Sequence, residues 1–119
     1  GSSSSSKSGD GKPLSEAMQT KLLNARDLYE KEKGSLSNVQ DTIDALDKIK
    51  GEISDDDARD AINAMEYALN ARREAVSWND HGESGGKQNF IDYYDAVANA
   101  GYPELVSDLS ALYDREKNG

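Results

Sequence analysis

The chain has 119 residues and no cysteine, and its formal net charge at pH 7 is -9. This length fits a single domain with one hydrophobic core. The acidic balance argues against nucleic-acid binding, which relies on basic side chains, and against electrostatic attachment to anionic lipid. The lack of cysteine excludes disulfides and thiolate chemistry, and no apolar run approaches the roughly 20 residues of a membrane-spanning helix.

Residues 1–12 contain six serines, three glycines and no large apolar side chain. Such a segment cannot bury enough surface to offset its conformational entropy, so we expect a flexible tether. Its origin stays open between a cloning remnant with a disordered end and a native linker. Residues 13–119 form the expected single helical domain, and Pro13 suits the first turn of a helix.

The next two segments have apolar residues at intervals of three or four, as in helices that bury one face. The first predicted helix ends at Gly34. The second has Ser37, or alternatively Ser35, as its N-cap and ends at Gly51. The apolar face of the first comprises Leu14, Met18, Leu22, Ala25 and Tyr29, widened by Leu23 and Leu28. That of the second comprises Leu36, Val39, Ile43, Leu46 and either Ile49 or Ile53.

The third predicted helix, Ser54 to Trp78, has a capping-box-like start in Ser54 and Asp57. It carries two adjacent rows, one bulky (Ile62, Met65, Leu69, Val76) and one small (Ala61, Ala68, Ala75). Two rows imply contact with more than one partner helix. Because the connections around Gly34 and Gly51 are short, the first three helices should run up, down and up as antiparallel neighbours.

The helical pattern breaks between Asn79 and Lys87, where three glycines and no apolar side chain predict the longest internal loop. A fourth helix then ends at Gly101, and Pro103 opens a fifth. The face of the fourth comprises Phe90, Tyr93, Tyr94 and Val97, and that of the fifth Leu105, Val106, Leu109, Leu112 and Tyr113. The expected fold is all-α: a small bundle of about five helices whose last two form a corner packed across the first three.

The predicted loop contains the single histidine, His81, beside Asp80 and Glu83. The calcium-loop alternation of aspartates with a glutamate at the twelfth position is missing, and zinc would need more histidine or cysteine. We therefore expect a solvated or partner-contacting loop, with no metal and no other cofactor.

Aromatic residues gather in the second half of the chain and could form a ligand-binding patch beside this loop. The candidate ligand-binding residues are Trp78, Tyr94 and Tyr102, which border the loop or the helical corner, together with His81. The competing interpretation is ordinary core packing, because Phe90 and Tyr94 lie on one regularly spaced apolar face.

No catalytic set is recognisable. The single His81 has no accompanying G-x-S-x-G elbow, phosphate loop or H-E-x-x-H motif, and no carboxylate pair stands out among the 23 acidic residues. We therefore expect no enzymatic activity and name no catalytic residue.

A serine-rich run that leads into an acidic helical domain resembles the start of a mature bacterial lipoprotein, just after its lipid-bearing cysteine. The resemblance covers residues 1–12. It implies an extracytoplasmic domain whose only membrane contact is an N-terminal lipid anchor outside this chain. The expected function is a non-catalytic, monomeric module that binds a protein, peptide or small ligand and no nucleic acid.

The alternative is a cytoplasmic acidic regulator, such as an antitoxin, an immunity protein or a nucleic-acid mimic, which binds a basic protein. Lysines interleaved with the acids, as in Glu30-Lys31-Glu32-Lys33, weaken the case for a mimic. Self-association through an exposed apolar row is a third possibility.

Overall fold

The computed structural model describes residues 14–81 and 84–118, with side chains for all of these except residues 78–81 and 84–86. The helices, in chain order, are α1 (Glu16–Ser35), α2 (Val39–Glu52), α3 (Asp56–His81), α4 (Ser84–Asn99), the 3₁₀ helix η1 (Pro103–Leu109) and α5 (Ser110–Asn118). No strand occurs in these two ranges, which confirms the all-α class with five α-helices. The predicted tether and Pro13 lie outside the described residues.

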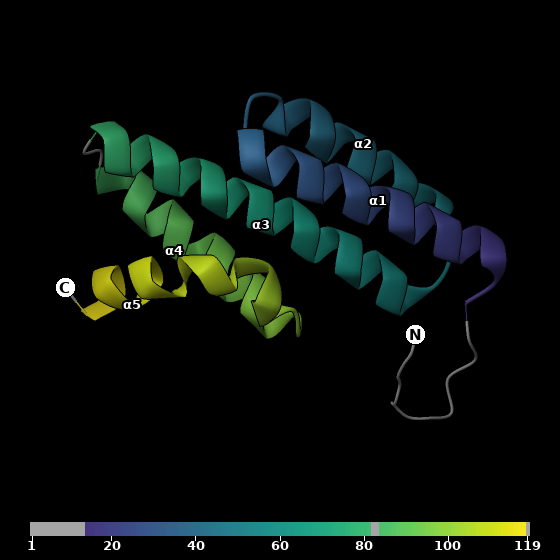
Figure 1. The fold of residues 1–119 in the computed structure, drawn as a ribbon. Coiled ribbons are helices and arrows are strands. Elements are labelled where there is room, and N and C mark those ends of the chain that lie inside the picture. The colour runs from purple at the N-terminus through teal and green to yellow at the C-terminus, as the bar shows by residue number, and fades with distance from the viewer. Residues whose placement is uncertain (1–13, 82–83, 119) are drawn as a thin grey trace.

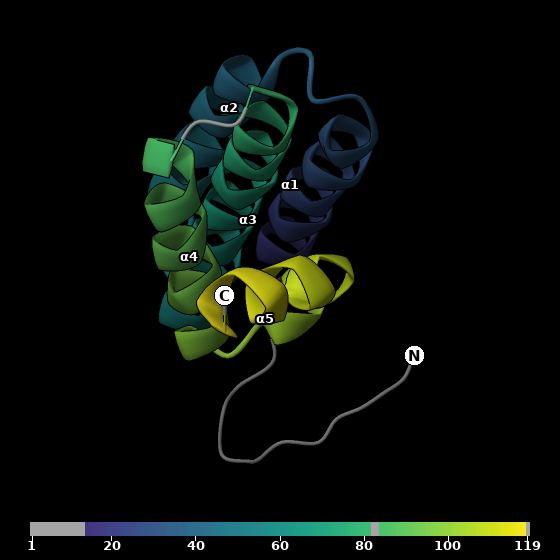
Figure 2. The same cartoon turned by 90° about the vertical axis from the view of Figure 1, so that its left-hand side faces the viewer.

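The first three helices run up, down and up, as expected from their short connections (Figure 1). Each of them contacts the other two. After α3 the chain reverses, and α4 runs back alongside α3. The contact between α3 and α4 is the most extensive in the bundle. The predicted corner between the fourth and fifth helices lies at Gly101, after which η1 contacts α3 and α4, and α5 contacts α4. Figure 2 shows α5 lying crosswise to the long helices. The prediction that the third helix has several partners is confirmed, because α3 contacts α1, α2, α4 and η1.

The turn between α1 and α2 is built from a leucine in the left-handed region. α1 continues through Gly34, which was expected to end it, and its C-cap is Leu36 with φ 56° and ψ 28°. A left-handed conformation costs roughly 1–2 kcal/mol for a residue with a Cβ. Its N–H group is satisfied by Glu32 O at 2.7 Å, and the carboxylate of Glu32 accepts the backbone N–H of Asn38, the N-cap of α2. These bonds place the reversal two residues later than Gly34 and the N-cap one residue after Ser37.

The start of α3 is capped by Asp55 and not by Ser54. The Oδ2 atom of Asp55 accepts the N–H of Ala58 at 3.0 Å, which satisfies one of the four free amides of the first turn. Serine and aspartate are both favoured at the N-cap, so the sequence alone cannot decide whether the helix begins after Ser54 or after Asp55.

The prediction of a long loop from Asn79 to Lys87 is wrong. α3 extends to His81 and α4 begins at Ser84, so only Gly82 and Glu83 lie between the two helices. The remaining two glycines of this stretch fall in the first turn of α4. Their low helix propensity is offset by tertiary packing, because the later turns of α4 bury their apolar face against α3.

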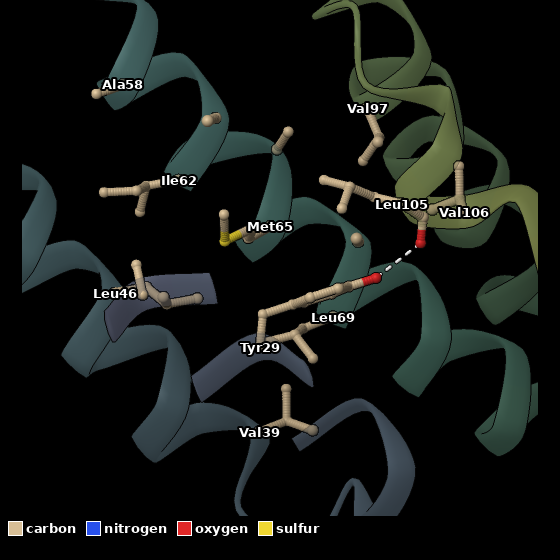
Figure 3. Close-up of a cluster of buried hydrophobic side chains, with 14 of the residues drawn as sticks. Tyr29, Val39, Leu46, Ala58, Ile62, Met65, Leu69, Val97, Leu105 and Val106 are labelled. Carbon is tan, nitrogen blue, oxygen red and sulfur yellow. Dashed lines mark hydrogen bonds between the residues drawn. The ribbon is translucent and has the colours of Figure 1, made fainter. Parts of the chain in front are cut away.

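The core is organised around α3. Its buried side chains are Ala58, Ala61, Ile62, Ala64, Met65, Ala68, Leu69, Ala71 and Ala75. Around them pack Ala25 and Tyr29 of α1, Val39 and Leu46 of α2, Phe90 and Val97 of α4, and Leu105 and Val106 of η1. Figure 3 shows part of this core, with Tyr29, Leu46 and Leu105 around α3. Both predicted rows of α3 are therefore buried, with one exception. Val76, the last residue of the bulky row, is 50% exposed.

The fifth predicted helix is two helices. Pro103 opens η1 as expected, but the chain kinks at Val106, whose φ is -121° and ψ is 21°. Because of this kink, Leu105 and Val106 are buried in the core, whereas α5 has no fully buried residue.

Candidate ligand-binding groove

A groove of about 720 Å³ lies between α1, the start of α3 and the turn that opens η1. Its apolar lining residues are Leu14, Leu22, Leu23, Ala58, Ala61, Met65, Tyr102 and Leu105, and its charged ones are Arg26, Asp55, Asp57 and Glu104. This volume is within the range of about 300–1,000 Å³ that small-molecule pockets occupy.

Small residues on α3 create the hollow. Ala58, Ala61 and Met65 are buried and lie on successive turns of α3, where two methyl side chains leave space beside the longer Met65. Leu22 and Leu23 of α1 form the facing wall. Leu23 is 66% exposed, although the sequence pattern counted it as a widening of the buried face. The apolar face of α1 is therefore wider than the surface that the bundle covers.

The third wall is the turn between α4 and η1, and hydrogen bonds fix its position. Gly101 has φ +97°, a conformation that suits glycine, and Tyr102 N then donates to Val97 O at 3.2 Å. The hydroxyl of Tyr102 donates to Asp57 O at 3.4 Å, which ties this wall to the first turn of α3.

A second anchor ties the same wall to α1. Tyr29 is 1% exposed, and its hydroxyl donates to Leu105 O at 2.7 Å (Figure 3). All three walls of the groove are therefore joined to one another by packing or hydrogen bonds.

The rim of the groove is acidic. Burial raises the pKa of Tyr102, and the nearby carboxylates of Asp57, Asp60, Glu104 and Asp55 raise it further, because each disfavours a second negative charge. The groove thus has an apolar floor and a rim whose carboxylates make the local electrostatic potential negative.

The structure places the four candidate site residues in three different parts of the bundle. Tyr102 lines the groove, beside the first turn of α3. Trp78 and His81 belong to the last turn of the same helix, and 21 residues of α-helix between Asp57 and Trp78 span about 30 Å. Trp78 and Tyr102 therefore do not form one patch. The side chains of Trp78 and His81 lie outside the described part of the chain.

Tyr94 belongs to an aromatic cluster between α4 and α5. Its ring stacks on Tyr113 with centroids 4.0 Å apart and an interplanar angle of 9°. Phe90, which is fully buried, meets both rings edge to face. This arrangement agrees with the core-packing interpretation of this face.

Sequence reasoning missed most of the groove. Leu22 and Leu23 were assigned to the core of α1, and Glu104 was not considered. The only sequence signal was the excess width of the apolar face of α1. A face of this width can contact the bundle core on one side and a further partner on the other.

A smaller hollow of about 180 Å³ lies on another side of the bundle. It is lined by Leu36, Arg72, Ala75, Val76, Leu109 and Leu112. Its volume is below that of an ordinary ligand pocket.

Among the described side chains, no three or more histidine, aspartate or glutamate residues converge in a way that could hold a metal ion. None of the helices in the described ranges has both the length and the apolar character needed to cross a bilayer. Searches against protein-family models, curated proteins and solved structures found no match to this chain.

Proposed function

We propose that this protein is a non-catalytic binding module and that the groove between α1, α3 and η1 is its binding site. The observation that carries the proposal is an apolar surface that the described residues leave uncovered. Leu23 stays 66% exposed next to the buried side chains of Ala61 and Met65 that form the floor. Concave apolar surfaces rimmed by a few polar groups are the usual form of a ligand or partner site.

The chemistry of the lining supports binding rather than catalysis. The groove contains carboxylates, one guanidinium and one phenol, and no hydroxyl or imidazole paired with a base among its lining residues. Nucleophilic or general acid–base catalysis needs such a pair within hydrogen-bond reach.

We further propose that the module is tethered at the bacterial cell surface, as the resemblance of residues 1–12 to a lipoprotein start implies. A Gly/Ser-rich linker of 12 residues generally has an end-to-end distance of about 20 Å, which is enough to hold a domain clear of lipid headgroups. Intact mass of the protein extracted from its own host tests this. A diacylglyceryl cysteine before the serine run is the expected result, and an unmodified chain in the soluble fraction contradicts it.

The alternative of a cytoplasmic acidic regulator is favoured by the net charge of -9. A cytoplasmic regulator would use the same groove but would carry no lipid anchor, so the same mass measurement distinguishes it from a cell-surface module. Its partner would be a basic protein drawn in by long-range attraction, with binding that weakens steeply as salt increases.

The binding site is tested with neutral probes, which report on the hollow and not on its charge. Indole and cyclohexanol are titrated into the uniformly ¹⁵N-labelled chain, and amide shifts are followed. We expect the shifts to map to the groove. The variant Ala61→Leu fills the hollow and should abolish them, whereas Val76→Leu enlarges an exposed side chain on the same helix and should not. Shifts that map to the hollow at Val76, or that survive Ala61→Leu in a folded protein, contradict the proposal.

A further inference from the structure

We infer that the partner of the groove is a protein segment that presents large apolar side chains next to lysine or arginine. This inference rests on the proposed function, because it assigns a chemistry to the occupant of the same site. It follows from where the carboxylates of the rim stand relative to the apolar floor.

The carboxylates come from two different walls. Asp55 and Asp57 lie at the start of α3, and Glu104 lies at the start of η1, two residues after Tyr102. Against these three, the lining contains one basic residue, Arg26. A ligand that fills the apolar floor therefore passes between carboxylates, and a cation beside its apolar group would pair with them.

Tyr102, on the wall that η1 opens, lies in the field of these same carboxylates. Burial and four nearby carboxylates raise the pKa of Tyr102, so a negative charge at this position is opposed by its surroundings. A positive charge there would be favoured by the same carboxylates. The chain's net charge of -9 adds long-range attraction for a cationic partner.

The length of the groove favours a polypeptide segment over a compact cation. Its α3 lining runs from Asp55 to Met65, which is about 15 Å of helix rise, or nearly three turns. A segment of about ten residues in helical form matches this length, with apolar residues at every third or fourth position on the floor. A second copy of this chain is a poor match, because it carries the same net negative charge.

The rim residues differ in what they do for the fold. Asp55 caps α3 and is unsuitable for a binding test. Asp57 and Glu104 are exposed and can be changed. The matched control residues are Asp44 on α2 and Asp92 on α4, which do not line the groove. Among the described contacts, each accepts one side-chain hydrogen bond, from the glutamine four residues earlier.

The test uses three rhodamine-labelled 12-residue peptides and fluorescence anisotropy with the whole chain. One peptide has leucine on one helical face and lysine beside it, the second has glutamate in place of lysine, and the third has serine in place of leucine. We expect the leucine–lysine peptide to bind most tightly. Its Kd should increase on the order of tenfold in the double variant Asp57→Asn/Glu104→Gln, and by less than about twofold in Asp44→Asn/Asp92→Asn.

Charge reversal gives the sharpest outcome. In Asp57→Lys/Glu104→Lys the preference should switch to the leucine–glutamate peptide, because the floor is unchanged and the rim has the opposite sign. An equal loss in the Asp44/Asp92 control would show that overall acidity attracts the peptide, and this would overturn the inference. Equal binding of the lysine and glutamate peptides would also overturn it.

The two proposals fail in different ways. If indole and cyclohexanol bind the groove but no peptide does, the inference is wrong and the binding site stands. If neither the fragments nor the peptides bind there, the proposed function is wrong as well. Self-association that Leu23→Lys abolishes would assign the groove to a second copy and would overturn the cationic partner.

Discussion

The hydroxyl of Tyr29 on α1 donates a hydrogen bond of 2.7 Å to the carbonyl oxygen of Leu105, 76 residues later in the chain. Tyr29 is 1% exposed and Leu105 is 7% exposed, so neither group can exchange this bond for water. The bond joins the first helix of the bundle to the corner that closes it. Removing it should therefore cost more than removing a surface hydroxyl.

Tyr29→Phe keeps the ring and leaves the carbonyl of Leu105 without this donor. We expect the free energy of unfolding to fall by about 1–2 kcal/mol, measured by urea denaturation. Tyr67→Phe is the matched control, because Tyr67 is 37% exposed and its hydroxyl loss should change stability by less than about 0.5 kcal/mol. Equal effects of the two substitutions would show that the Tyr29 bond adds nothing to the fold.

Arg72 and Asp108 form an ion pair with unequal burial. Nη2 of Arg72 lies 2.7 Å and 2.9 Å from the two carboxylate oxygens of Asp108. The arginine side chain is 11% exposed and the aspartate 61%. Burial alone would lower the pKa of Arg72, but interactions with Tyr29 and Asp108 outweigh it and the pKa is raised.

Asp108→Ala leaves a largely buried guanidinium without this partner, whereas Arg72→Met leaves an exposed carboxylate that water can solvate. We expect Asp108→Ala to cost about 1–3 kcal/mol and Arg72→Met to cost less, because methionine retains the apolar stem. Denaturation of both single variants and the double variant gives the coupling energy. A larger loss in Arg72→Met would mean that the guanidinium stabilises the fold through more than its pair with Asp108, with Tyr29 as the other partner.

Glu66 should make stability depend on pH. Burial raises its pKa above the usual 4.5, Lys50 lowers it and Asp47 raises it, with a net increase. Its Oε2 atom accepts no hydrogen bond from the described residues and lies 3.8 Å from the Lys50 ammonium. The folded state therefore holds this proton more tightly than the unfolded state does.

Stability from Glu66 protonation is present below pH 4.5 and is lost as pH rises through the folded pKa. Glu66→Gln mimics the protonated group, so its urea midpoint should exceed that of the unchanged protein at pH 7 and converge with it near pH 4. Glu74→Gln, on the same helix, is the control for substitution at other acidic positions. A lower midpoint for Glu66→Gln at pH 7 would show that attraction to Lys50 outweighs burial.

Tyr113 holds α5 to the bundle. Besides stacking on Tyr94, its hydroxyl donates to Asp95 Oδ1 at 2.7 Å, and α5 has no fully buried residue of its own. In Tyr113→Leu we expect hydrogen-exchange protection of α5 amides to fall about tenfold, with α3 unchanged. Tyr113→Phe keeps the ring and should lose less. A uniform loss of protection across all helices would show that α5 unfolds only with the whole domain.

The helices of the bundle could be predicted from sequence because each carries its own periodic apolar face. The rows of α3 and the faces of α1 and α2 are local patterns, and three of the four bulky residues predicted on α3 are buried. Helix ends were less predictable. Ser54 and Asp55 are equivalent as caps, and the reversal at Leu36 depends on the carboxylate of Glu32, which the pattern around Gly34 does not reveal.

The groove could not be predicted in the same way. Its walls come from three segments far apart in the chain, and which part of each apolar face remains uncovered depends on tertiary packing. Leu23 and Leu22 have the same residue type and adjacent positions, yet Leu22 is half-buried and Leu23 is exposed. The aromatic composition drew attention to Trp78, Tyr94 and Tyr102 alike, whereas packing places Tyr102 in the groove and Tyr94 against Tyr113.

Because the groove exists only when residues near Leu22, Ala61 and Tyr102 are assembled, its ligand binds the folded chain and not the unfolded one. Occupancy and folding are then one linked equilibrium. A ligand present at about 100 times its Kd adds about 2.7 kcal/mol to the free energy of unfolding. A thermal melt of the intact domain is therefore a ligand assay that needs neither a label nor an identified partner.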